Sequence, residues 1–378
     1  LVRSRGLGDV YKRQVFGTRP EAIKLAPLIL KFKEDENIQT FVITTGQHRE
    51  MVNQILDFFD ITPDINLNIM KHNQTLEYIT STTIEKLSSL VENLQPDIVF
   101  VQGDTTTAFA SALVSFYKRL KVAHIEAGLR SFNKYAPFPE EINRALISKI
   151  ADYHFAPTET ARRNLYKEGI KKNVYVVGNT VIDALLMAVD KVKNNISYYE
   201  EKFSFIDKSR KVILVTGHRR ESFGKPFENI CYAIKKIAQD FDVEIVYPAH
   251  LNPNVREPVM KILSDIKNVH IIDPVDYPSL VYLMYMSYLV ITDSGGIQEE
   301  APALGKPVLV MREVTERIEG IKAGTAKLVG SNPQKIYKYV SKLIKDEKFY
   351  NKMSKAINPY GDGKASDRIY KILTSKYK

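Results

Sequence analysis

The chain has 378 residues, of which 44% are hydrophobic and 26% charged, and this balance excludes a disordered or collagen-like protein. The length is comfortable for two domains. Although the net charge is +10, the positive charge gathers at the ends: residues 1–14 carry +3 and residues 334–378 carry +8, which leaves −1 for residues 15–333. A body this close to neutral argues against a nucleic-acid partner.

The sequence lacks the features of a secreted or membrane-bound protein. Cys231 is the single cysteine, which excludes an internal disulfide and a cysteine-based metal site and fits a reducing compartment. No apolar run approaches the roughly 18–20 residues of a membrane span, and the first residues lack the apolar stretch of a secretion signal. We therefore expect a cytoplasmic protein with no membrane partner.

From Val15 onward, short apolar runs rich in β-branched residues alternate with longer segments of helical spacing, such as residues 20–32 and 105–120. The runs are continuously apolar, as expected for parallel strands that are covered on both faces. This alternation predicts a doubly wound α/β fold. The expected strands lie at residues 40–44, 98–102, 122–126, 153–156, 174–177, 212–216, 243–247, 269–272, 289–292 and 307–311.

The series is interrupted at about residues 183–211, a polar stretch after which a second series of strands and helices begins. We place a domain boundary there. The sequence thus predicts two Rossmann-like, doubly wound parallel-sheet domains facing a cleft, at residues 15–182 and 183–362, with a last helix over residues 363–378.

The expected first strand is short of suitable residues. A buried strand of about five residues should precede the first turn, but only Val15 and Phe16 are apolar there, and residues 1–14 are polar and basic. We therefore expect residues 1–14 to be a non-native leader that replaces the first strand.

Two turns early in the first domain place polar side chains where parallel strands end, the edge at which doubly wound sheets bind ligands. Arg19 and Lys24 lie at a helix start, where they suit a phosphate, although an ordinary capped helix would also contain such residues. Asp104 follows another strand. It either caps the next helix or serves as a catalytic carboxylate, or does both.

The third turn carries two further acids. Glu126 ends a buried strand, which is costly for a carboxylate without a partner or a task, and Arg130 or Arg144 would be a structural partner for it. We favour a functional role for Glu126. Glu140 follows a Pro-Phe-Pro run and is also consistent with an ordinary acid in the first turn of a helix.

Two turns in the second domain also carry candidate groups. His218 stands beside two arginines in a glycine turn, where it suits acid–base work or a phosphate contact as well as a structural role. The run Ser294-Gly295-Gly296 opens a helix and favours a phosphate cradle over a simple tight turn. Glu300, four residues on, is placed to take ribose hydroxyls.

Weaker candidates are Gln47, Met51 and His250, which are also consistent with loops of no function. Known metal-ligand spacings and a nucleophile elbow are absent, so we expect no metal. Two domains, a phosphate cradle and several carboxylates favour a nucleotide-sugar site. These residues alone do not specify a reaction.

Several segments occur together in a characteristic order: Gly-Thr-Arg-Pro-Glu-Ala-Ile-Lys, Thr-Gly-Gln-His-Arg-Glu-Met, Gln-Gly-Asp-Thr-Thr-Thr, His-Ile-Glu-Ala-Gly-Leu-Arg, Phe-Pro-Glu-Glu-Ile-Asn-Arg, Gly-His-Arg-Arg-Glu-Ser-Phe-Gly and Asp-Ser-Gly-Gly-Ile-Gln-Glu-Glu-Ala-Pro. The chain closely resembles the bacterial non-hydrolysing UDP-N-acetylglucosamine 2-epimerases from Val15 to its last helix. The resemblance implies a B-type glycosyltransferase-like fold whose last helix packs back on the first domain.

The resemblance also implies a reaction: reversible epimerisation at C2 between UDP-N-acetylglucosamine and UDP-N-acetylmannosamine, without NAD, metal or other cofactor. UDP would leave across C1–C2 to give a 2-acetamidoglucal and then return, with protonation on the opposite face. A cytoplasmic homodimer that supplies cell-surface polysaccharide synthesis is implied as well.

Residue roles follow from the resemblance at matching positions. The acid–base candidates are Asp104, Glu126, Glu140 and His218; which carboxylate removes the proton stays open, and His218 would stabilise the leaving diphosphate. The substrate-binding positions are Arg19, Lys24, Ser294, Gly295, Gly296, Glu300 and Arg317. The positions of a second, activating UDP-N-acetylglucosamine are Gln47, Met51 and His250. Val275 replaces a polar residue that is common near the uracil.

Three other functions fit the same residues. A hydrolysing epimerase would release UDP and free N-acetylmannosamine, a glycosyltransferase would need an acceptor, and a binding protein would hold the nucleotide sugar without turnover. Release of free sugar and UDP would identify the first, turnover only with an added acceptor the second, and UDP binding without deuterium uptake at C2 the third.

Overall fold

The computed structural model describes residues 10–46, 49–71 and 73–377, and the chain divides into two compact units. The N-terminal unit runs to Ala184 and takes up the chain again from Gly361, whereas the C-terminal unit is Leu185–Tyr360. Both boundaries lie within two residues of the expected ones. In the part of the chain that the structure describes, no helix combines the length and apolarity needed to cross a membrane.

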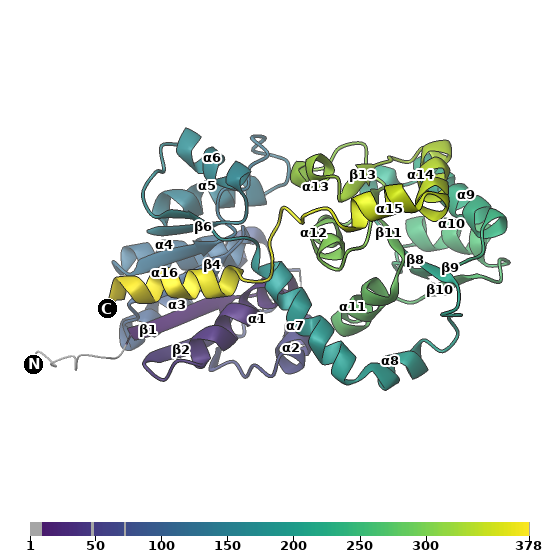
Figure 1. Ribbon diagram of the computed structural model, residues 1–378. Coiled ribbons are helices and arrows are strands. Elements are labelled where there is room, and N and C mark those ends of the chain that lie inside the picture. The colour runs from purple at the N-terminus through teal and green to yellow at the C-terminus, as the bar shows by residue number, and fades with distance from the viewer. Residues whose placement is uncertain (1–9, 47–48, 72, 378) are drawn as a thin grey trace, which may run out of the picture. The chain divides into compact units, whose positions relative to one another are not determined.

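The N-terminal unit is built on a parallel sheet that has seven strands among the described residues, in the order β3-β2-β1-β4-β5-β6-β7 (Figure 1). The direction in which strands are added reverses between β1 and β4, as in doubly wound sheets. The strands are β1 (Val10–Phe16), β2 (Ile38–Thr44), β3 (Ile65–Asn66), β4 (Ile98–Gln102), β5 (Lys121–Ile125), β6 (Tyr153–Ala156) and β7 (Val174–Val176).

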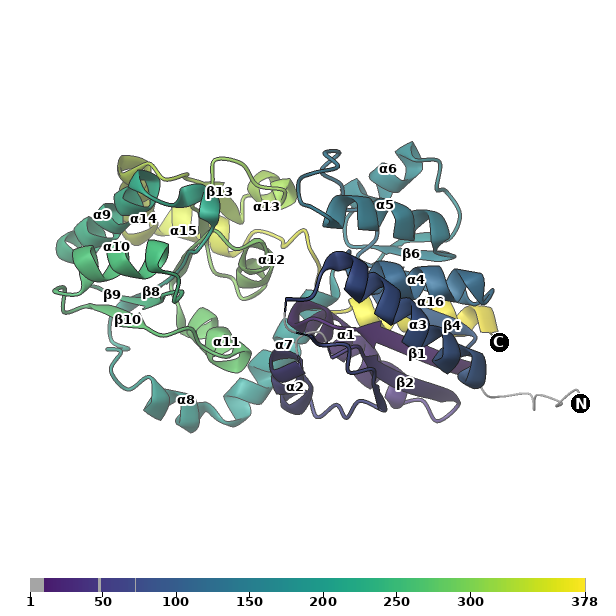
Figure 2. The ribbon, with the colours of Figure 1, turned by 180° about the vertical axis from the view of Figure 1, so that it is seen from behind.

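Helices cover both faces of this sheet. α1 packs with α16 on one face, and α3 packs with α4 on the other, as the two opposite views show (Figures 1 and 2). The helices of this unit are α1 (Arg19–Lys33), α2 (Arg49–Phe58), α3 (Leu76–Leu94), α4 (Thr106–Tyr117), α5 (Glu140–Ile150), α6 (Glu159–Lys167) and α16 (Ala365–Tyr377).

Strand β1 is the largest departure from the expected fold. The polar residues 10–14 were expected to lie outside the first strand, and this expectation is wrong, because β1 begins at Val10. Its main chain pairs with β2 from Val10 to Phe16 and also with β4. Main-chain pairing satisfies the donor and acceptor of every strand residue whatever its side chain, so a strand between two neighbours tolerates polar residues. Residues 1–9 lie outside the described part of the chain.

The last helix, α16, belongs to the N-terminal unit and packs on α1. The Tyr370 hydroxyl donates to Asp35 Oδ2 at 2.6 Å, and its ring lies 5.6 Å from that of Phe32, between centroids. At the start of α16, the Ser366 N–H donates to Asp183 Oδ1 at 2.7 Å. These contacts hold the chain's C-terminal segment on the unit where the chain begins.

The C-terminal unit repeats the plan. Its described residues form a parallel sheet of six strands in the order β10-β9-β8-β11-β12-β13, with the reversal between β8 and β11. The strands are β8 (Lys211–Thr216), β9 (Val243–Pro248), β10 (Val269–Ile272), β11 (Leu289–Thr292), β12 (Val308–Val310) and β13 (Ala326–Leu328). The helices are α9 (Lys225–Asp240), α10 (Pro253–Leu263), α11 (Tyr277–Met286), α12 (Gly295–Ala303), α13 (Ile318–Ala323), α14 (Pro333–Lys345) and α15 (Glu347–Ser354), with a 3₁₀ turn η1 at Arg220–Ser222.

The polar stretch at residues 183–211, where the sequence analysis placed the boundary, contains helices. α7 (Thr180–Asn194) runs through the division between the units, and α8 (Ile196–Lys202) follows it. α7 mixes polar residues with apolar ones at helical spacing. Its polar composition therefore suggested an interruption of the strand–helix series, although the spacing of its apolar residues is that of a helix.

Both cores follow from strand sequences that are apolar on both faces. In the N-terminal unit, Val99 and Val101 of β4 belong to one buried cluster with Ala108 and Ala112 of α4. The small alanine side chains let the helix lie close to the sheet. The positions of the turns at the strand ends are therefore fixed by packed elements on either side.

Candidate functional site

In each unit, polar turns follow the two strands between which the strand order reverses. Residues 17–19 follow β1 and residues 103–105 follow β4, while residues 217–219 follow β8 and residues 293–296 follow β11. Open parallel sheets bind ligands at this switch point, outside the carboxyl ends of the strands. The turns selected from the sequence thus occupy the expected ligand-binding edge of their own sheet.

Asp104 lies in the turn after β4 and is held by two residues of α5. The Arg144 Nε lies 3.0 Å from Asp104 Oδ2, and the Asn143 side-chain amide donates to the Asp104 carbonyl oxygen at 2.9 Å. Thr105 is the N-cap of α4, since its hydroxyl accepts from the Ala108 N–H at 3.0 Å. The alternative that Asp104 caps this helix is therefore wrong, and its carboxylate is available for another role.

Burial raises the pKa of Asp104 to about 6, because desolvation penalises the charged carboxylate. The guanidinium of Arg144 opposes this rise, whereas the neighbouring charge of Glu126 adds to it. A carboxyl group with a pKa near 6 populates both its acid and its base form close to neutral pH. That property suits a group that takes up and returns a proton.

Glu126 follows β5 and has a left-handed backbone, with φ of 65°. Its side chain is buried and forms an ion pair with Lys24 of α1. The Gln102 side-chain amide also donates to Glu126 Oε2, at 3.1 Å. The structure therefore brings together two residues, Lys24 and Glu126, that the sequence placed in separate candidate turns.

The two arginines considered as partners of Glu126 have other carboxylates. Arg130 pairs with Glu168 through its Nε, 2.6 Å from Oε1, and Arg144 pairs with Asp104. Neither arginine of the structural alternative therefore pairs with Glu126. Glu126 pairs instead with an ammonium from a helix 102 residues earlier in the chain, which no local pattern could indicate.

Glu21 joins the two turns at the switch point of the N-terminal unit. Its buried carboxylate accepts the N–H of Gly17 at 3.0 Å, the N–H of Thr18 at 2.8 Å and the hydroxyl of Thr105 at 2.6 Å. Burial raises the pKa of Glu21 above its ordinary value, although these hydrogen bonds lower it in part. The sequence did not predict this link, although the spacing Thr18-x-x-Glu21 is a capping-box signal for the contact between Glu21 and the turn after β1.

The two acids at the start of α5 differ in their surroundings. Glu141 accepts the N–H groups of Ser131 at 2.9 Å and Phe132 at 3.0 Å, so it holds the preceding loop. The Oε2 of Glu140 is buried and has no hydrogen-bond partner among the described residues. Of the pair, Glu140 is thus the acid that keeps a carboxylate oxygen for another partner.

Other predicted residues of the N-terminal unit lie at the ends of helices. Arg19 is the first residue of α1, and Met51 is an exposed residue of α2. Gln47 lies outside the described residues. In the part of the chain that the structure describes, no group of three or more His, Cys, Asp or Glu side chains could hold a metal ion.

In the C-terminal unit, Asp293 connects the turns after β8 and β11. Its Oδ2 accepts the N–H of His218 at 2.7 Å and the N–H of Arg219 at 2.8 Å. The ring of His218 stacks on that of His250, with centroids 5.3 Å apart and an interplanar angle of 16°. The structure thus brings together His218 and His250, which the sequence placed in different turns.

The predicted cradle is the N-terminus of α12. Ser294 is the N-cap residue, and its own N–H donates to Thr292 Oγ1 at 3.0 Å. A methyl group on Gly295 would lie 3.3 Å from Arg317 Cζ, so the guanidinium lies directly against the first turn of the helix. Helix N–H groups and a guanidinium together form a site for an anion such as a phosphate.

Two acids of α12 support this arrangement. The Arg317 Nε donates to the buried Glu299 Oε1 at 2.8 Å, which fixes the guanidinium. Glu300 is also buried, and its Oε2 lies 3.5 Å from the position of a Cβ on Gly296. Ser294, Gly295, Gly296, Glu300 and Arg317, all predicted from the sequence, therefore gather at one helix end.

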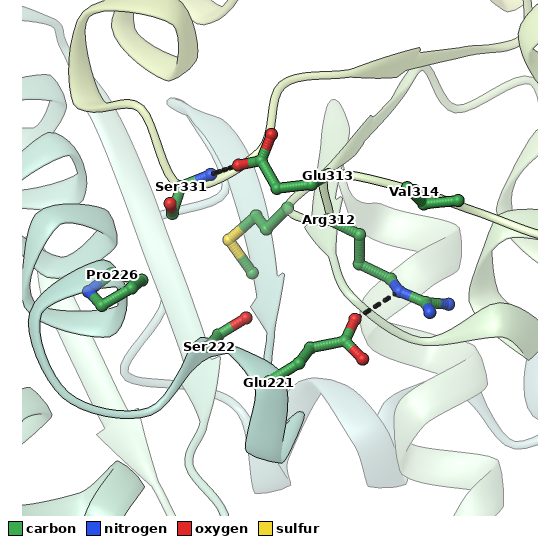
Figure 3. Close-up of a pocket in the computed structure, with 8 residues that line it drawn as sticks. Glu221, Ser222, Pro226, Arg312, Glu313, Val314 and Ser331 are labelled. Atoms are coloured by element: carbon green, nitrogen blue, oxygen red, sulfur yellow. Dashed lines mark hydrogen bonds and ion pairs between the residues drawn. The ribbon is translucent and has the colours of Figure 1, made fainter. Parts of the chain in front are cut away.

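A pocket of about 330 Å³ lies beside η1 and the residues that follow β12 (Figure 3). Its charges are paired with one another or with the main chain: Arg312 Nε donates to Glu221 Oε1 at 2.8 Å, and Glu313 Oε1 accepts the Ser331 N–H at 3.3 Å. None of the predicted site residues lines it. The lining residues are Glu221, Ser222, Pro226, Met311, Arg312, Glu313, Val314 and Ser331.

The sequence did not predict two carboxylates that support the site through their contacts: Asp293, which accepts main-chain N–H groups of the His218 turn, and Glu299, which pairs with Arg317. Asp293 directly precedes the cradle and Glu299 directly precedes Glu300, but both are recognisable only from the partners they contact. Arg144 was considered only as a structural residue, and its contact with Asp104 depends on the packing of α5 on α4 and β5.

Two doubly wound parallel-sheet units, each with polar turns at its switch point, define a protein of the B-type glycosyltransferase-like architecture. The same fold, at 14% identity and a TM-score of 0.58, occurs in MurG from Acinetobacter baumannii, which matches 97% of this chain and 99% of its own. A family model described as UDP-N-acetylglucosamine 2-epimerase matches residues 30–374. The chain belongs to the UDP-N-acetylglucosamine 2-epimerase family.

Individual relatives agree with this family. The UDP-N-acetylglucosamine 2-epimerase of Escherichia coli K12 is 53% identical over 364 residues, which is 95% of this chain and 97% of the relative. The crystal structure of UDP-GlcNAc 2-epimerase from Neisseria meningitidis bound to UDP-GlcNAc is 49% identical and superimposes with a TM-score of 0.89, covering 97% of this chain and 100% of that one.

Proposed function

We propose that the chain is a non-hydrolysing epimerase that interconverts UDP-N-acetylglucosamine and UDP-N-acetylmannosamine. Membership of the family supports the substrate and the reaction class. The observation that carries the proposal is the Asp104 carboxyl group, which lies at the switch point with its pKa raised to about 6 and beside Arg144. Such a group serves as base in one direction of a reversible proton transfer and as acid in the other.

The proposed reaction is an elimination followed by an addition. A carboxylate removes the C2 proton, the C1–O bond breaks with its electron pair passing to UDP, and a C1–C2 double bond gives 2-acetamidoglucal. UDP then adds back at C1 while an acid protonates C2 from the opposite face. Elimination is needed because C2 has no adjacent carbonyl to acidify its proton.

Two acid–base groups are needed, one for each face of C2. Asp104, which is partly buried, and Glu126, which is buried, are carboxyl groups of the N-terminal unit with cationic partners, Arg144 and Lys24. Glu140 contributes a buried oxygen without a partner among the described residues. We assign proton transfer at the two faces of C2 to this set.

Departure of UDP requires stabilisation of a diphosphate. The N-terminus of α12 with Arg317 supplies N–H donors and a guanidinium. His218, whose turn Asp293 holds, is assigned to the leaving diphosphate. Glu300 is assigned to the ribose hydroxyls.

One experiment separates this function from its rivals: incubation with UDP-N-acetylglucosamine in heavy water, followed by NMR. We expect an equilibrium mixture of two UDP-sugars that carry deuterium at C2. Accumulation of free sugar and UDP would instead identify a hydrolysing epimerase. Turnover only with an added acceptor would identify a transferase, and UDP binding without exchange would identify a binding protein.

Further features of the family are proposed here on the resemblance. A second UDP-N-acetylglucosamine would activate the enzyme through Gln47, Met51 and His250, and the product would feed cell-surface polysaccharide synthesis in the cytoplasm. Titration of the initial rate with UDP-N-acetylglucosamine tests activation, which predicts a sigmoidal curve.

We also propose a homodimer. α4 and α5, which pack on each other, expose apolar side chains that a second copy would cover. Sedimentation equilibrium tests this association, and a single species of about 43 kDa would contradict it. The exposed side chains are Phe116, Tyr117, Ile142 and Leu146.

A further inference from the structure

We propose that Asp293 is a positioning residue for His218: it fixes the tautomer of the imidazole, so that Nε2 is presented to the ligand. The inference rests on the proposed role of His218 at the leaving diphosphate. It adds a function for a buried carboxylate that the proposed reaction does not otherwise use.

The two oxygens of Asp293 have different surroundings. Oδ2 accepts the N–H groups of His218 and Arg219, at 2.7 and 2.8 Å, and so anchors the main chain of the turn. Oδ1 is buried, has no hydrogen-bond partner among the described residues and lies 4.0 Å from the Nδ1 of His218. An unpaired buried carboxylate oxygen is costly. A small rotation of the His218 ring would give it a partner.

The neighbours of His218 leave this arrangement little freedom. His250 stacks on the ring, and the Tyr247 hydroxyl donates to the carbonyl oxygen of the preceding residue, Gly217, at 3.2 Å. The side chain of His218 is 51% exposed, whereas that of Asp293 is 3% exposed. The ring is thus accessible to a ligand on its outer side while its Nδ1 faces a buried anion.

The position of Asp293 in the fold links this turn to the cradle. Asp293 follows the last residue of β11 and directly precedes Ser294, the N-cap of α12. One carboxylate therefore sets the His218 turn relative to the helix N-terminus assigned to the diphosphate. An Nδ1–H hydrogen bond to Oδ1 would leave Nε2 to interact with that ligand, as carboxylate–histidine pairs do elsewhere.

The variant Asp293→Asn distinguishes the proposed positioning role from a purely structural one, in which Asp293 only anchors the main chain. The asparagine carbonyl oxygen still accepts the N–H groups of His218 and Arg219, while its NH₂ group faces Nδ1 in place of an anion. The substitution keeps the anchor and removes the acceptor that selects the Nδ1–H tautomer.

A matched control exists in the same sheet. Glu244, the second residue of β9, is a buried carboxylate that pairs with His270, as Asp293 faces His218, but it lies near the beginning of a strand rather than at the ligand-binding edge. Glu244→Gln removes a carboxylate–histidine contact far from the cradle. We expect it to lower stability and to leave turnover unchanged.

The experiment combines ¹⁵N spectra of histidine-labelled full-length protein with the C2 exchange assay, and His218→Asn assigns the signals. In the wild-type protein at about pH 8 we expect His218 as the Nδ1–H tautomer, and in Asp293→Asn a shift toward the Nε2–H tautomer. We expect Asp293→Asn to lower kcat by about 10- to 100-fold and to change KM by less than about threefold.

An Nε2–H tautomer of His218 in the wild-type protein would overturn the proposal even if the variant did not fold. Unchanged His218 signals in a folded Asp293→Asn variant, or an unchanged kcat, would also overturn it. Failure of the proposed function is a separate result: the wild-type protein would then show no exchange at C2, whatever the tautomer of His218.

Discussion

Arg144 Nε lies 3.0 Å from Asp104 Oδ2, and this guanidinium offsets only part of the desolvation of the carboxylate. The pKa of Asp104 stays raised, at about 6, despite an ion pair that would by itself lower it. The pair therefore holds an acid whose charged form is costly in the folded protein. Groups of this kind gather at sites of proton transfer, where function is gained at the expense of stability.

Replacement of Asp104 by asparagine should lower the rate of deuterium exchange at C2 by about 100-fold or more, because the amide cannot take up or return the proton. UDP binding should be retained within about threefold, since the proposed diphosphate cradle belongs to the other unit. Exchange measured by NMR and UDP affinity measured by calorimetry check the two parts. Normal exchange would remove Asp104 from the mechanism.

The same substitution should stabilise the protein at neutral pH. A folded-state pKa of about 6, against the ordinary 3.8, means that the folded chain binds this proton more tightly than the unfolded chain. The contribution of Asp104 to the unfolding free energy of the wild type therefore falls as pH rises from about 4 to about 6, by at most about 3 kcal/mol. Asparagine does not ionise, so Asp104→Asn should gain about 1–2 kcal/mol at pH 7.5 and nothing near pH 4.

Urea unfolding of wild type and Asp104→Asn at the two pH values measures this difference. A variant that is less stable than the wild type at pH 7.5 would show that the contact with Arg144 outweighs desolvation, contrary to the raised pKa.

Glu21 should prove essential to the geometry of the N-terminal turns. Glu21→Gln replaces an acceptor of three hydrogen bonds by a group that accepts at only one of its two terminal atoms, so the bond from Thr105, beside Asp104, is lost or reversed. We expect about a tenfold loss of exchange and a loss of about 1–2 kcal/mol of stability. Glu85→Gln, which changes an exposed acid within α3, is the control and should alter neither.

Activity and stability of Glu21→Gln that match those of the control would show that the link between the turns after β1 and β4 is dispensable. A loss of stability with full exchange would limit Glu21 to a structural role.

The sequence predicted the turns better than the groups that support them. The strands at residues 98–102, 153–156, 269–272 and 289–292 have the predicted bounds, because continuous apolar runs between turn residues have few alternatives. Most of β1 was not predicted, because residues 12–14 are polar and the prediction required a continuous apolar run. The structure forms this strand through main-chain pairing with β2 and β4, which leaves no apolar pattern in the sequence.

The contacts of the site could not be predicted where the two partners are distant in sequence. Asp104 and Glu126 were selected as carboxylates at strand ends, but their contacts with Arg144 and Lys24 depend on the packing of α5 and α1. Glu21 and Asp293 show the same limit, since each is identified by the main-chain N–H groups it accepts. Spacing along the chain cannot reveal such contacts, because they arise only when the sheet brings two turns to one edge.

The cradle at α12 provides the most local test of the assigned diphosphate site. A Cβ at Gly295 would lie 3.3 Å from the Cζ of Arg317, tighter than ordinary packing, so Gly295→Ala should displace the guanidinium from the helix N-terminus. Because alanine favours a helix over glycine by about 1 kcal/mol, the fold should not suffer. We expect UDP affinity, measured by calorimetry, to fall about tenfold with an unchanged melting temperature. An unchanged affinity for UDP would show that neither Arg317 nor the first turn of α12 binds the diphosphate.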